Sequence, residues 1–382
     1  MRICYLGDCT HIHDLRFVTK LVERGYDTHI VTFMDNPIEV SGVKYHSVPF
    51  PDLFFRSPRR LWRSKKILRE ILREIKPDVL HAGWIHTYGF LAAVSGFHPF
   101  LLMPWGSDIL LKRDDIFSFT RFSIFNKVVS RYAQRYATRY AINKADMITC
   151  DAEHVKKEIV RLIGYPADRI IIFPWGIDLS KFNPEADGSL IRKRLGWEDN
   201  KILIMTRAFE PVYGIEYFLQ ALPQIIRECP EARAILCGDG SLRGELERFV
   251  KDKGLNEYVH FAGFVKNDDL PYYLASADVY VSCSLSDGTS LSLLEAMACG
   301  LPVVVSDVPA ILEWVKDGEN GFTVPVHDTT SLEQKIVYFL EREDLRENFG
   351  KRNWQIAQER ANWDINFEKL EGIYRHLAEG RR

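Results

Sequence analysis

One stretch of the sequence combines a glycine turn, hydroxyl side chains and carboxylates in an order that suits anion binding. Between Ser286 and Asp307 it predicts a turn at Gly288, a helix beginning near Thr289 and Ser290, and then a buried strand. Hydroxyl residues cap a helix and leave its other first N–H groups free, and the helix dipole attracts anions such as a diphosphate. The stretch therefore indicates an anion site, with an ordinary capped helix as the alternative.

Two carboxylates belong to the same stretch. Asp287 precedes Gly288 in the turn, and Glu295 lies one and a half turns into the predicted helix. Because apolar residues surround Glu295 in the sequence, we expect a partly buried carboxylate, which can accept hydrogen bonds from two ribose hydroxyls. A solvent-facing glutamate is the competing interpretation.

A cation follows another predicted strand. Arg207 comes directly after the strand at residues 202–206 and before the turn at Gly214. A diphosphate carries about two to three negative charges, so a cation is expected to meet it. Because ligands bind at strand ends in doubly wound sheets, we expect Arg207 to bind phosphate and not to form a surface salt bridge.

Polar and aromatic side chains follow the strands of the first half. Gly7, Asp8, His11 and His13 come after the first strand, where the histidines either orient sugar hydroxyls or remain solvated. Trp105 comes after a later strand. A tryptophan at a loop end either stacks on a sugar or packs against the edge of a sheet. The loops lie at strand ends and point into a cleft, and such side chains are typical of sugar-stacking surfaces.

Short apolar runs alternate with longer amphipathic runs along the chain, which is typical of βαβ units and parallel sheets. Strands are predicted at residues 2–6, 27–33, 79–82, 100–103, 147–150, 170–173, 202–206, 233–237, 259–261, 279–282, 302–306 and 321–324. Helices are predicted at residues 15–24, 60–75, 88–95, 119–145, 153–163, 214–227, 242–253, 270–275, 290–299, 310–316, 331–341 and 363–377. The alternation restarts after residue 184, so we expect two domains with a cleft at the strand ends.

The composition excludes several classes of protein. The chain has 382 residues and a formal net charge of −2, so it is long enough for two domains and gives no reason to expect nucleic acid. Its seven cysteines are scattered, which indicates reduced core residues. It lacks a signal-peptide pattern and a run of about 18 apolar residues, so we expect a cytoplasmic protein. No metal-binding motif is present, and neither metal nor cofactor is expected.

In this order and spacing the motifs resemble the signature of the family-4 retaining glycosyltransferases (glycosyl transferases group 1), which have the GT-B fold. That family carries two acidic residues separated by seven, and Asp287 and Glu295 match them. Other similar segments are an Arg-Gly-Tyr step at residues 24–26, a hinge at residues 173–184 and an Asn-Gly turn at residues 320–321. The resemblance covers nearly the whole chain.

The resemblance implies roles for individual residues. It places the first acidic residue of the pair on the donor sugar, the second on the ribose, and Arg207 on the phosphates. The implied donor-binding residues are Arg207, Tyr213, Gly238, Phe264, Val265, Asp287, Gly288, Thr289, Ser290 and Glu295. The implied acceptor-side residues are Gly7, Asp8, His11, His13 and Trp105, and the candidate catalytic residues are Arg207, Asp287 and Asp108.

Three positions depart from the family pattern. Asp287 stands where glutamate is usual, which shifts the sugar hydroxyl that it reaches. Tyr213 replaces the usual lysine and brings no charge to the phosphates. Trp105 stands where relatives carry a histidine near the reacting sugar, and either Asp108 or His86 is a candidate replacement.

We therefore expect an α/β protein of the GT-B class, with two Rossmann-like, doubly wound parallel-sheet domains facing across a cleft. The expected domains are an acceptor-side domain at residues 1–180, a nucleotide-sugar-binding domain at residues 181–362, and a terminal helix at residues 363–382 that packs back on one of them. The expected function is transfer of a sugar from a nucleotide-diphosphate sugar to an acceptor hydroxyl with retention of configuration. The alternatives are a nucleotide-sugar epimerase or hydrolase, and an inactive nucleotide-sugar-binding subunit.

A basic and aromatic tract runs through residues 54–69 and is followed by a long basic helix near residues 121–144. Such helices can lie on an anionic membrane and deliver a lipid acceptor, which would place the chain peripherally at the inner membrane face. The alternative is an ordinary amphipathic helix whose charges face water. The expected partners are the nucleotide sugar and a sugar, glycan or lipid-linked acceptor.

Overall fold

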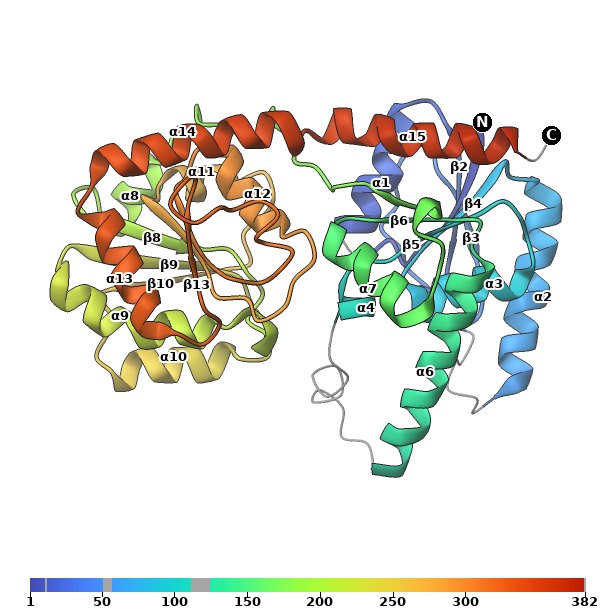
Figure 1. Cartoon of the computed structure of the whole chain (residues 1–382), viewed down its shortest axis with the longest axis horizontal. Helices are drawn as coiled ribbons and strands as arrows, with labels where there is room; N and C mark the ends of the chain where they lie inside the picture. The colour runs from blue at the N-terminus through green and yellow to red at the C-terminus, as the bar shows by residue number, and fades with distance from the viewer. Residues whose placement is uncertain (11, 51–56, 111–123, 381–382) are drawn as a thin grey trace. The chain divides into compact units, whose positions relative to one another are not determined.

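The computed structural model describes residues 1–10, 12–50, 57–110 and 124–380, and the chain divides into two compact units. Unit 1 comprises Met1–Phe173 and Lys369–Arg382, and unit 2 comprises Pro174–Glu368 (Figure 1). Each unit is built around one parallel sheet with helices between the strands, which confirms the predicted pair of doubly wound α/β domains.

Unit 1 contains a seven-stranded sheet in the order β3-β2-β1-β4-β5-β6-β7. Its strands are β1 (Arg2–Leu6), β2 (Asp27–Thr32), β3 (Lys44–Ser47), β4 (Val79–Gly83), β5 (Phe100–Met103), β6 (Met147–Cys150) and β7 (Ile170–Ile172). Its helices are α1 (Ile12–Glu23), α2 (Pro58–Ile75), η1 (Ile85–Gly89), α3 (Phe90–Ser95), α4 (Ser107–Leu110), α6 (Ile124–Lys144), α7 (Glu153–Ile163) and η2 (Ala167–Arg169). The strand order reverses between β1 and β4, so the loops after these strands flank the position where doubly wound folds bind ligands.

Unit 2 contains a six-stranded sheet in the order β10-β9-β8-β11-β12-β13, which reverses between β8 and β11. Its strands are β8 (Lys201–Met205), β9 (Ala232–Cys237), β10 (Val259–Gly263), β11 (Val279–Ser282), β12 (Val303–Ser306) and β13 (Phe322–Val324). Its helices are α8 (Ser189–Leu195), η3 (Pro211–Tyr213), α9 (Ile215–Glu228), α10 (Arg243–Asp252), α11 (Leu270–Ala275), α12 (Leu291–Ala298), α13 (Thr329–Leu340) and α14 (Glu343–Arg360).

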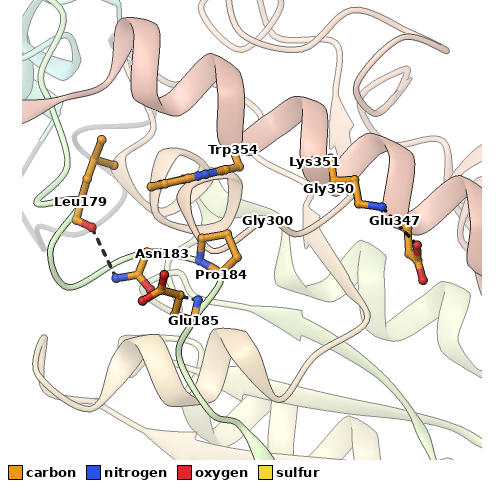
Figure 2. A pocket seen from close by; sticks show the side chains of 9 residues that line it. All are labelled: Leu179, Asn183, Pro184, Glu185, Gly300, Glu347, Gly350, Lys351 and Trp354. Carbon is orange, nitrogen blue, oxygen red and sulfur yellow. Dashed lines mark hydrogen bonds and ion pairs between the residues drawn. The ribbon is translucent and has the colours of Figure 1, made fainter.

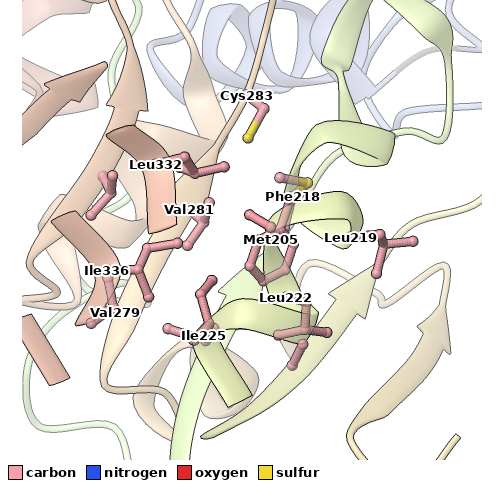
Figure 3. Packing of buried hydrophobic residues seen from close by; sticks show 14 of the residues in the cluster. Met205, Phe218, Leu219, Leu222, Ile225, Val279, Val281, Cys283, Leu332 and Ile336 are labelled. Carbon is pink, nitrogen blue, oxygen red and sulfur yellow. The ribbon is translucent and has the colours of Figure 1, made fainter. Parts of the chain in front are cut away.

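The sheet of unit 2 is buried on both faces. Along β8, Leu203 and Met205 belong to a core cluster with α9, α10 and α13, whereas Ile202 and Ile204 belong to a second cluster with α8, α11, α12 and α14. Figure 3 shows part of the first cluster, in which Phe218 of α9 packs close to Met205. Successive side chains of a strand point to opposite faces, so the unbroken apolar runs in the sequence are explained by helices on both sides.

Helix α15 (Trp363–Glu379) begins in unit 2 and ends in unit 1. At its start, the N–H of Trp363 donates to the carbonyl of Ile177 over 3.1 Å. Further along, the hydroxyl of Tyr374 lies 2.7 Å from Nδ1 of His81, and Tyr26 donates to Glu371 over 3.1 Å. The second half of the predicted terminal helix therefore packs on unit 1.

The fold corrects one predicted helix and contains elements, among them β3, α8 and α14, that the sequence did not predict. The predicted helix at residues 310–316 is absent, because residues 310–314 form turns and residues 315–316 are irregular. Strand β3 has half-buried or exposed side chains at the sheet edge, so it lacks the apolar run that marks the other strands. Helix α14 buries Gly350 and Asn353 as well as apolar residues, so the spacing of its apolar residues did not indicate a helix. The short helix α8 was not predicted either. Among the described residues, no helix combines the length and apolar character needed to cross a bilayer.

Candidate functional site

The reversal of strand order in unit 2 brings together two residues that are far apart in the sequence. Arg207 follows β8 and Asp287 follows β11, so both lie at the carboxyl ends of the two strands that flank the reversal. Their side chains form an ion pair with 2.6 Å between Nη2 and Oδ2. The fold therefore brings the cation and the first residue of the acidic pair to one site.

The guanidinium of Arg207 is enclosed by polar and aromatic groups. Its Nη1 donates to the hydroxyl oxygens of Ser290 and Ser292, both over 2.9 Å. The ring of Tyr213 lies against it, with the Cζ atom 3.9 Å from the ring centroid. Only 9% of the Arg207 side chain and 14% of the Asp287 side chain are exposed, so both charges are largely removed from water.

Burial and pairing act in opposite directions on this ion pair. Burial alone lowers the pKa of Arg207, but Asp287 and the neighbouring tyrosines outweigh it and raise that pKa above its ordinary value. Burial raises the pKa of Asp287, although the Arg207 guanidinium opposes the shift. Tyr213 contributes an aromatic face in place of a charge, so Arg207 is the cation of this cluster and is already partly neutralised by Asp287.

Three loops of unit 2 hold this cluster in place. The N–H of Phe209 donates to the carbonyl of Asp239 over 2.9 Å, which ties the loop after β8 to the loop after β9. The N–H of Leu285 donates to the carbonyl of Val212 over 2.8 Å, which ties the loop after β11 to η3. The backbone that carries Arg207 and Asp287 is therefore braced from both sides.

Gly238, in the loop after β9, lies directly against the backbone of Arg207. A Cβ atom there would lie 2.0 Å from the carbonyl oxygen of Arg207, and the φ of Gly238 is +157°, which L-residues rarely adopt. Glycine is thus required for the loop after β9 to approach the backbone at Arg207. This contact explains why glycine is needed at position 238, which the resemblance implies to be part of the donor site.

Substitution of Gly238 by alanine should destabilise unit 2 by about 1–3 kcal/mol, because the new methyl group displaces the backbone at Arg207. Denaturant unfolding measures this loss. The matched control is Gly244→Ala in α10, where an added Cβ meets nothing within 4 Å. Alanine should stabilise that helix by about 0.5–1 kcal/mol. Equal effects of the two substitutions would contradict this account of the loop.

Helix α12 presents its N-terminus and one face to the cluster. Ser290 caps the helix by accepting the N–H of Leu293 over 3.4 Å, as the sequence predicts for this position. Ser292 contacts Arg207, and Glu295 follows three residues later on the same helical face. Glu295 is half-buried, and Thr289 and Ser290 are buried. The start of α12 therefore brings two hydroxyls to Arg207, and Glu295 lies about one turn further along the same helical face.

The edge strand β10 supplies a second part of the predicted donor site. Phe264 follows this strand and is 82% exposed, whereas Val265 is half-buried. Within β10, the ring of Phe261 lies under the guanidinium of Arg243, with 5.1 Å from Cζ to the centroid. The exposed ring of Phe264 is suited to stacking on a planar base.

Sequence reasoning missed three of these contact residues: Ser292, Tyr280 and Arg243. Tyr280 donates to Ser292 over 3.0 Å from within β11, where an apolar run gave no sign of a polar role. Ser292 lies two residues beyond the cap, and its spacing of three residues from Glu295, which puts both on one helical face, was an available signal. Arg243 begins α10 after the Gly-x-Gly turn and resembles an ordinary surface cation in the sequence.

In unit 1 the predicted acceptor residues lie after β1 and β5. Gly7 and Asp8 follow β1, and their loop is fixed to β2 by a bond from the N–H of Gly7 to the carbonyl of Val31 over 3.3 Å. Trp105 is half-buried and packs against Trp84, with ring centroids 5.8 Å apart. His11 lies outside the described residues, as does the side chain of His13. The acceptor role of these residues stays a prediction.

Asp108 links two loops of unit 1 through hydrogen bonds to their backbones. Its two carboxylate oxygens accept the backbone N–H groups of Ile85 over 3.0 Å and of Trp105 over 2.9 Å. Burial raises its pKa to about 6, against these stabilising bonds. The residue joins the loops after β4 and β5, so the structure supports a positioning role, and its catalytic role stays a prediction. His86 is partly buried with Nδ1 3.0 Å from the Thr138 hydroxyl, and burial lowers its pKa to about 4.

A separate pocket of about 640 Å³ lies elsewhere on unit 2 (Figure 2). It is lined by Leu179, Asn183, Pro184, Glu185, Gly300, Glu347, Gly350, Lys351 and Trp354. Gly300 follows the C-terminal end of α12, whereas Arg207 contacts the N-terminal end, so this pocket is not part of the Arg207 cluster. Within the described residues, no group of three or more His, Cys, Asp or Glu side chains is arranged to hold a metal ion.

Comparison with known proteins relates both halves of the chain to sugar transfer. A family model described as "Glycosyl transferases group 1" matches residues 188–355, and a model described as "Glycosyl transferase 4-like" matches residues 2–152. The chain is 24% identical over 240 residues to an alpha-D-kanosaminyltransferase of Streptomyces kanamyceticus. The match covers 62% of this chain and 62% of that one. The chain thus spans less than two thirds of that relative.

Two further comparisons cover more than nine tenths of the chain. It is 25% identical over 362 residues to an N-acetyl-alpha-D-glucosaminyl L-malate synthase of Bacillus anthracis, covering 93% of this chain and 90% of that one. The solved structure of Anabaena Alr3699/HepE in complex with UDP-glucose superimposes with a TM-score of 0.80 at 20% identity, over 99% of this chain and 100% of that one. The last likeness shows the shared fold.

Proposed function

The chain belongs to the family of glycosyl transferases group 1, and from that premise we propose that it transfers a sugar from a nucleoside diphosphate sugar to an acceptor hydroxyl. The observation that carries the proposal is the Arg207 guanidinium, held between Asp287 and the N-terminus of α12 where the strand order of unit 2 reverses. Cations and helix N-termini stabilise a departing diphosphate.

Each part of the donor is proposed to contact different residues of the site. The diphosphate lies against Arg207 and the N–H groups at the start of α12, and Glu295 accepts hydrogen bonds from the ribose. Asp287 contacts the donor sugar, and its bond to Arg207 fixes the orientation of the carboxylate. The base lies beside Phe264 and the backbone of Val265. The HepE complex with UDP-glucose supports a donor of this class.

The proposed reaction breaks the bond between the sugar C1 atom and the diphosphate oxygen, which keeps the electron pair. Arg207 stabilises the charge that develops on that oxygen. The acceptor hydroxyl forms the new bond to C1 from the same face, so configuration is retained, and its proton passes to the departing phosphate oxygen. No metal or further cofactor is assigned a role in these steps.

A transfer assay tests the proposal. The chain is incubated with a panel of labelled nucleotide sugars, including UDP-glucose, together with lipid and glycan extracts and with or without a chelator. Labelled product and released nucleoside diphosphate, both insensitive to the chelator, are expected. Turnover to free sugar or epimer without an acceptor would instead identify an epimerase or hydrolase. Tight donor binding without turnover would identify a binding subunit, the outcome consistent with Tyr213 in place of lysine.

We also propose that unit 1 contacts an anionic membrane through its basic face, defined as Arg59, Trp62, Arg63 and Lys66 of α2 with Arg135, Tyr136 and Arg139 of α6. The segment of α2 at residues 58–69 carries six Lys or Arg and no Asp or Glu. Trp62 and Tyr136 are 64% and 54% exposed, and Leu61 of α2 and Tyr140 of α6 pack in one cluster. Cations with exposed aromatic rings suit a headgroup layer.

Reversal of Arg59 and Arg63 to glutamate should lower the fraction of protein that floats with vesicles of about 30 mol% anionic lipid at least tenfold, since each nearby cation contributes about 1 kcal/mol. The matched control reverses Arg248 and Lys251 on the exposed side of α10, which changes the net charge equally. The proposal predicts unchanged flotation for that control. Equal losses for both variants, or no flotation of the unaltered chain, would contradict the basic face.

A further inference from the structure

Tyr280 contacts the Arg207 cluster from inside the sheet of unit 2. It lies in β11, which pairs with β8 on one side and with β12 on the other, and it has no exposed surface. Its neighbours Val279 and Val281 belong to the core cluster of Figure 3, on the opposite face of the sheet. Tyr280 belongs to the second core cluster, which contains the buried residues of α12. Its ring is therefore held by close packing on the side of the sheet that α12 covers.

The hydroxyl of Tyr280 is linked to Arg207 through one serine. It donates to the Ser292 oxygen over 3.0 Å, and Nη1 of Arg207 donates to the same oxygen over 2.9 Å. A guanidinium can only donate hydrogen bonds, so the Ser292 oxygen must accept from Arg207, and a hydroxyl oxygen has two lone pairs. The bonds from Tyr280 and Arg207 therefore occupy both lone pairs of Ser292 and fix the position of its oxygen.

Ser292 needs such a contact in order to face Arg207. A serine side chain has three staggered rotamers, and in a helix its hydroxyl can also turn to a backbone carbonyl of the preceding turn. Ser290 is held differently, because as the cap of α12 it also accepts the N–H of Leu293 over 3.4 Å. The bond from Tyr280 thus favours the one rotamer of Ser292 in which the oxygen meets Arg207.

The orientation of the Arg207 guanidinium depends on both of its terminal nitrogens. Asp287 pairs with Nη2 over 2.6 Å, and Ser290 and Ser292 accept from Nη1. A planar group held at one nitrogen can still turn about that contact, whereas contacts at both nitrogens fix its plane. The ring of Tyr213 covers one face of this plane. The serines therefore complete a geometry that the ion pair alone does not determine.

We propose that Tyr280 is a positioning residue for sugar transfer: through Ser292 it fixes the orientation of the Arg207 guanidinium. The inference rests on the proposed function in one respect, because this orientation matters for transfer only if Arg207 meets the diphosphate. A group that is oriented in advance stabilises developing charge without first losing rotational freedom. Since Tyr280 has no exposed surface, its hydroxyl acts on the donor through Ser292 and Arg207.

The exchange of the Arg207 Nε–H with water, measured by NMR on the full chain with ¹⁵N-labelled arginine, tests the inference without any ligand. This nitrogen is buried and has no hydrogen-bond partner among the residues that the structure describes, so its exchange reports how long the guanidinium stays in place. Tyr280→Phe keeps the ring, removes only the hydroxyl and should raise the exchange rate about three- to tenfold, the effect of one lost hydrogen bond. Loss of the signal in Arg207→Met assigns it.

Two further variants separate positioning from general stability. Tyr165→Phe is the matched control, because Tyr165 is buried in unit 1 and its hydroxyl donates to the carbonyl of Ala145 over 3.0 Å. It should destabilise its own unit and leave the exchange of Arg207 unchanged. Ser292→Ala should raise that exchange at least as much as Tyr280→Phe. The double variant should show no further rise, because the Tyr280 hydroxyl acts through the Ser292 oxygen.

Where transfer occurs, Tyr280→Phe should lower kcat/KM about three- to tenfold and should have no effect in a chain that already carries Arg207→Met. The inference is overturned if either Tyr280→Phe or Ser292→Ala leaves the exchange rate unchanged, or if Tyr165→Phe raises it equally. It is also overturned if the effects of Tyr280→Phe and Ser292→Ala multiply in the double variant. The proposed function fails separately, if the unaltered chain transfers no sugar, and the exchange rates still decide the role of Tyr280.

Discussion

Replacement of Arg207 by methionine should lower the rate of sugar transfer by about 10²–10³, the loss typical of removing one preorganised group that stabilises a developing negative charge. Arg207 is the cation that the structure places between Asp287 and the serines at the start of α12. Methionine keeps most of the volume and removes the charge. The measurement is kcat/KM for the donor, with single-turnover kinetics to separate binding from transfer.

A control is required because the same substitution leaves a buried carboxylate without its partner. Removing one member of a buried ion pair costs about 3–5 kcal/mol of stability, and the low exposure of both side chains places this pair in that class. Arg207→Met combined with Asp287→Asn should recover much of that stability and none of the transfer. Recovery of transfer in the double variant would show that Arg207 acts on folding alone.

Substitution of Glu295 by alanine should weaken the binding of a nucleoside diphosphate by about 10–100-fold, because a hydrogen bond to a charged group contributes about 1.5–3 kcal/mol. Glutamine at this position retains one acceptor and should give a smaller loss. The measurement is calorimetric titration with UDP. Glu359→Ala on the exposed side of α14 is the matched control and should leave the affinity unchanged. Equal affinity in the unaltered chain and Glu295→Ala would remove Glu295 from the ribose site.

The sequence was most informative where one physical pattern dominates. Buried parallel strands need unbroken apolar runs, so all the strands of both sheets except β3 were predicted close to their observed bounds. Strand β3 pairs only with β2 at the sheet edge, so its side chains need not be apolar. Helix α14 was missed because Gly350 packs on Gly300, where a Cβ atom would lie 2.0 Å from the carbonyl oxygen. Close helix contacts select glycine and weaken the apolar stripe.

Within the candidate site, the sequence predicted residues that follow strand ends and missed those that act through tertiary contacts. Arg207 was predicted because it follows a strand end, where doubly wound sheets bind ligands, and Asp287 was predicted from the resemblance to the family's pair of acidic residues. Their direct ion pair was not foreseen, since nothing in the sequence sets the distance between loops 80 residues apart. Asp14 precedes the predicted helix at residues 15–24 and was assigned no role, and only the fold brings its carboxyl group to the Tyr5 hydroxyl and the N–H group of Asp8.

The central claim is that the N-terminus of α12 with Arg207 binds the diphosphate of the donor, and hydrogen exchange with and without UDP tests it most directly. The account predicts that UDP slows exchange at the amides of residues 288–292 and of residues 263–265, and that Arg207→Met abolishes the first effect. It also predicts no change around the pocket lined by Trp354. Protection at that pocket, with the start of α12 unaffected by UDP, would contradict the account.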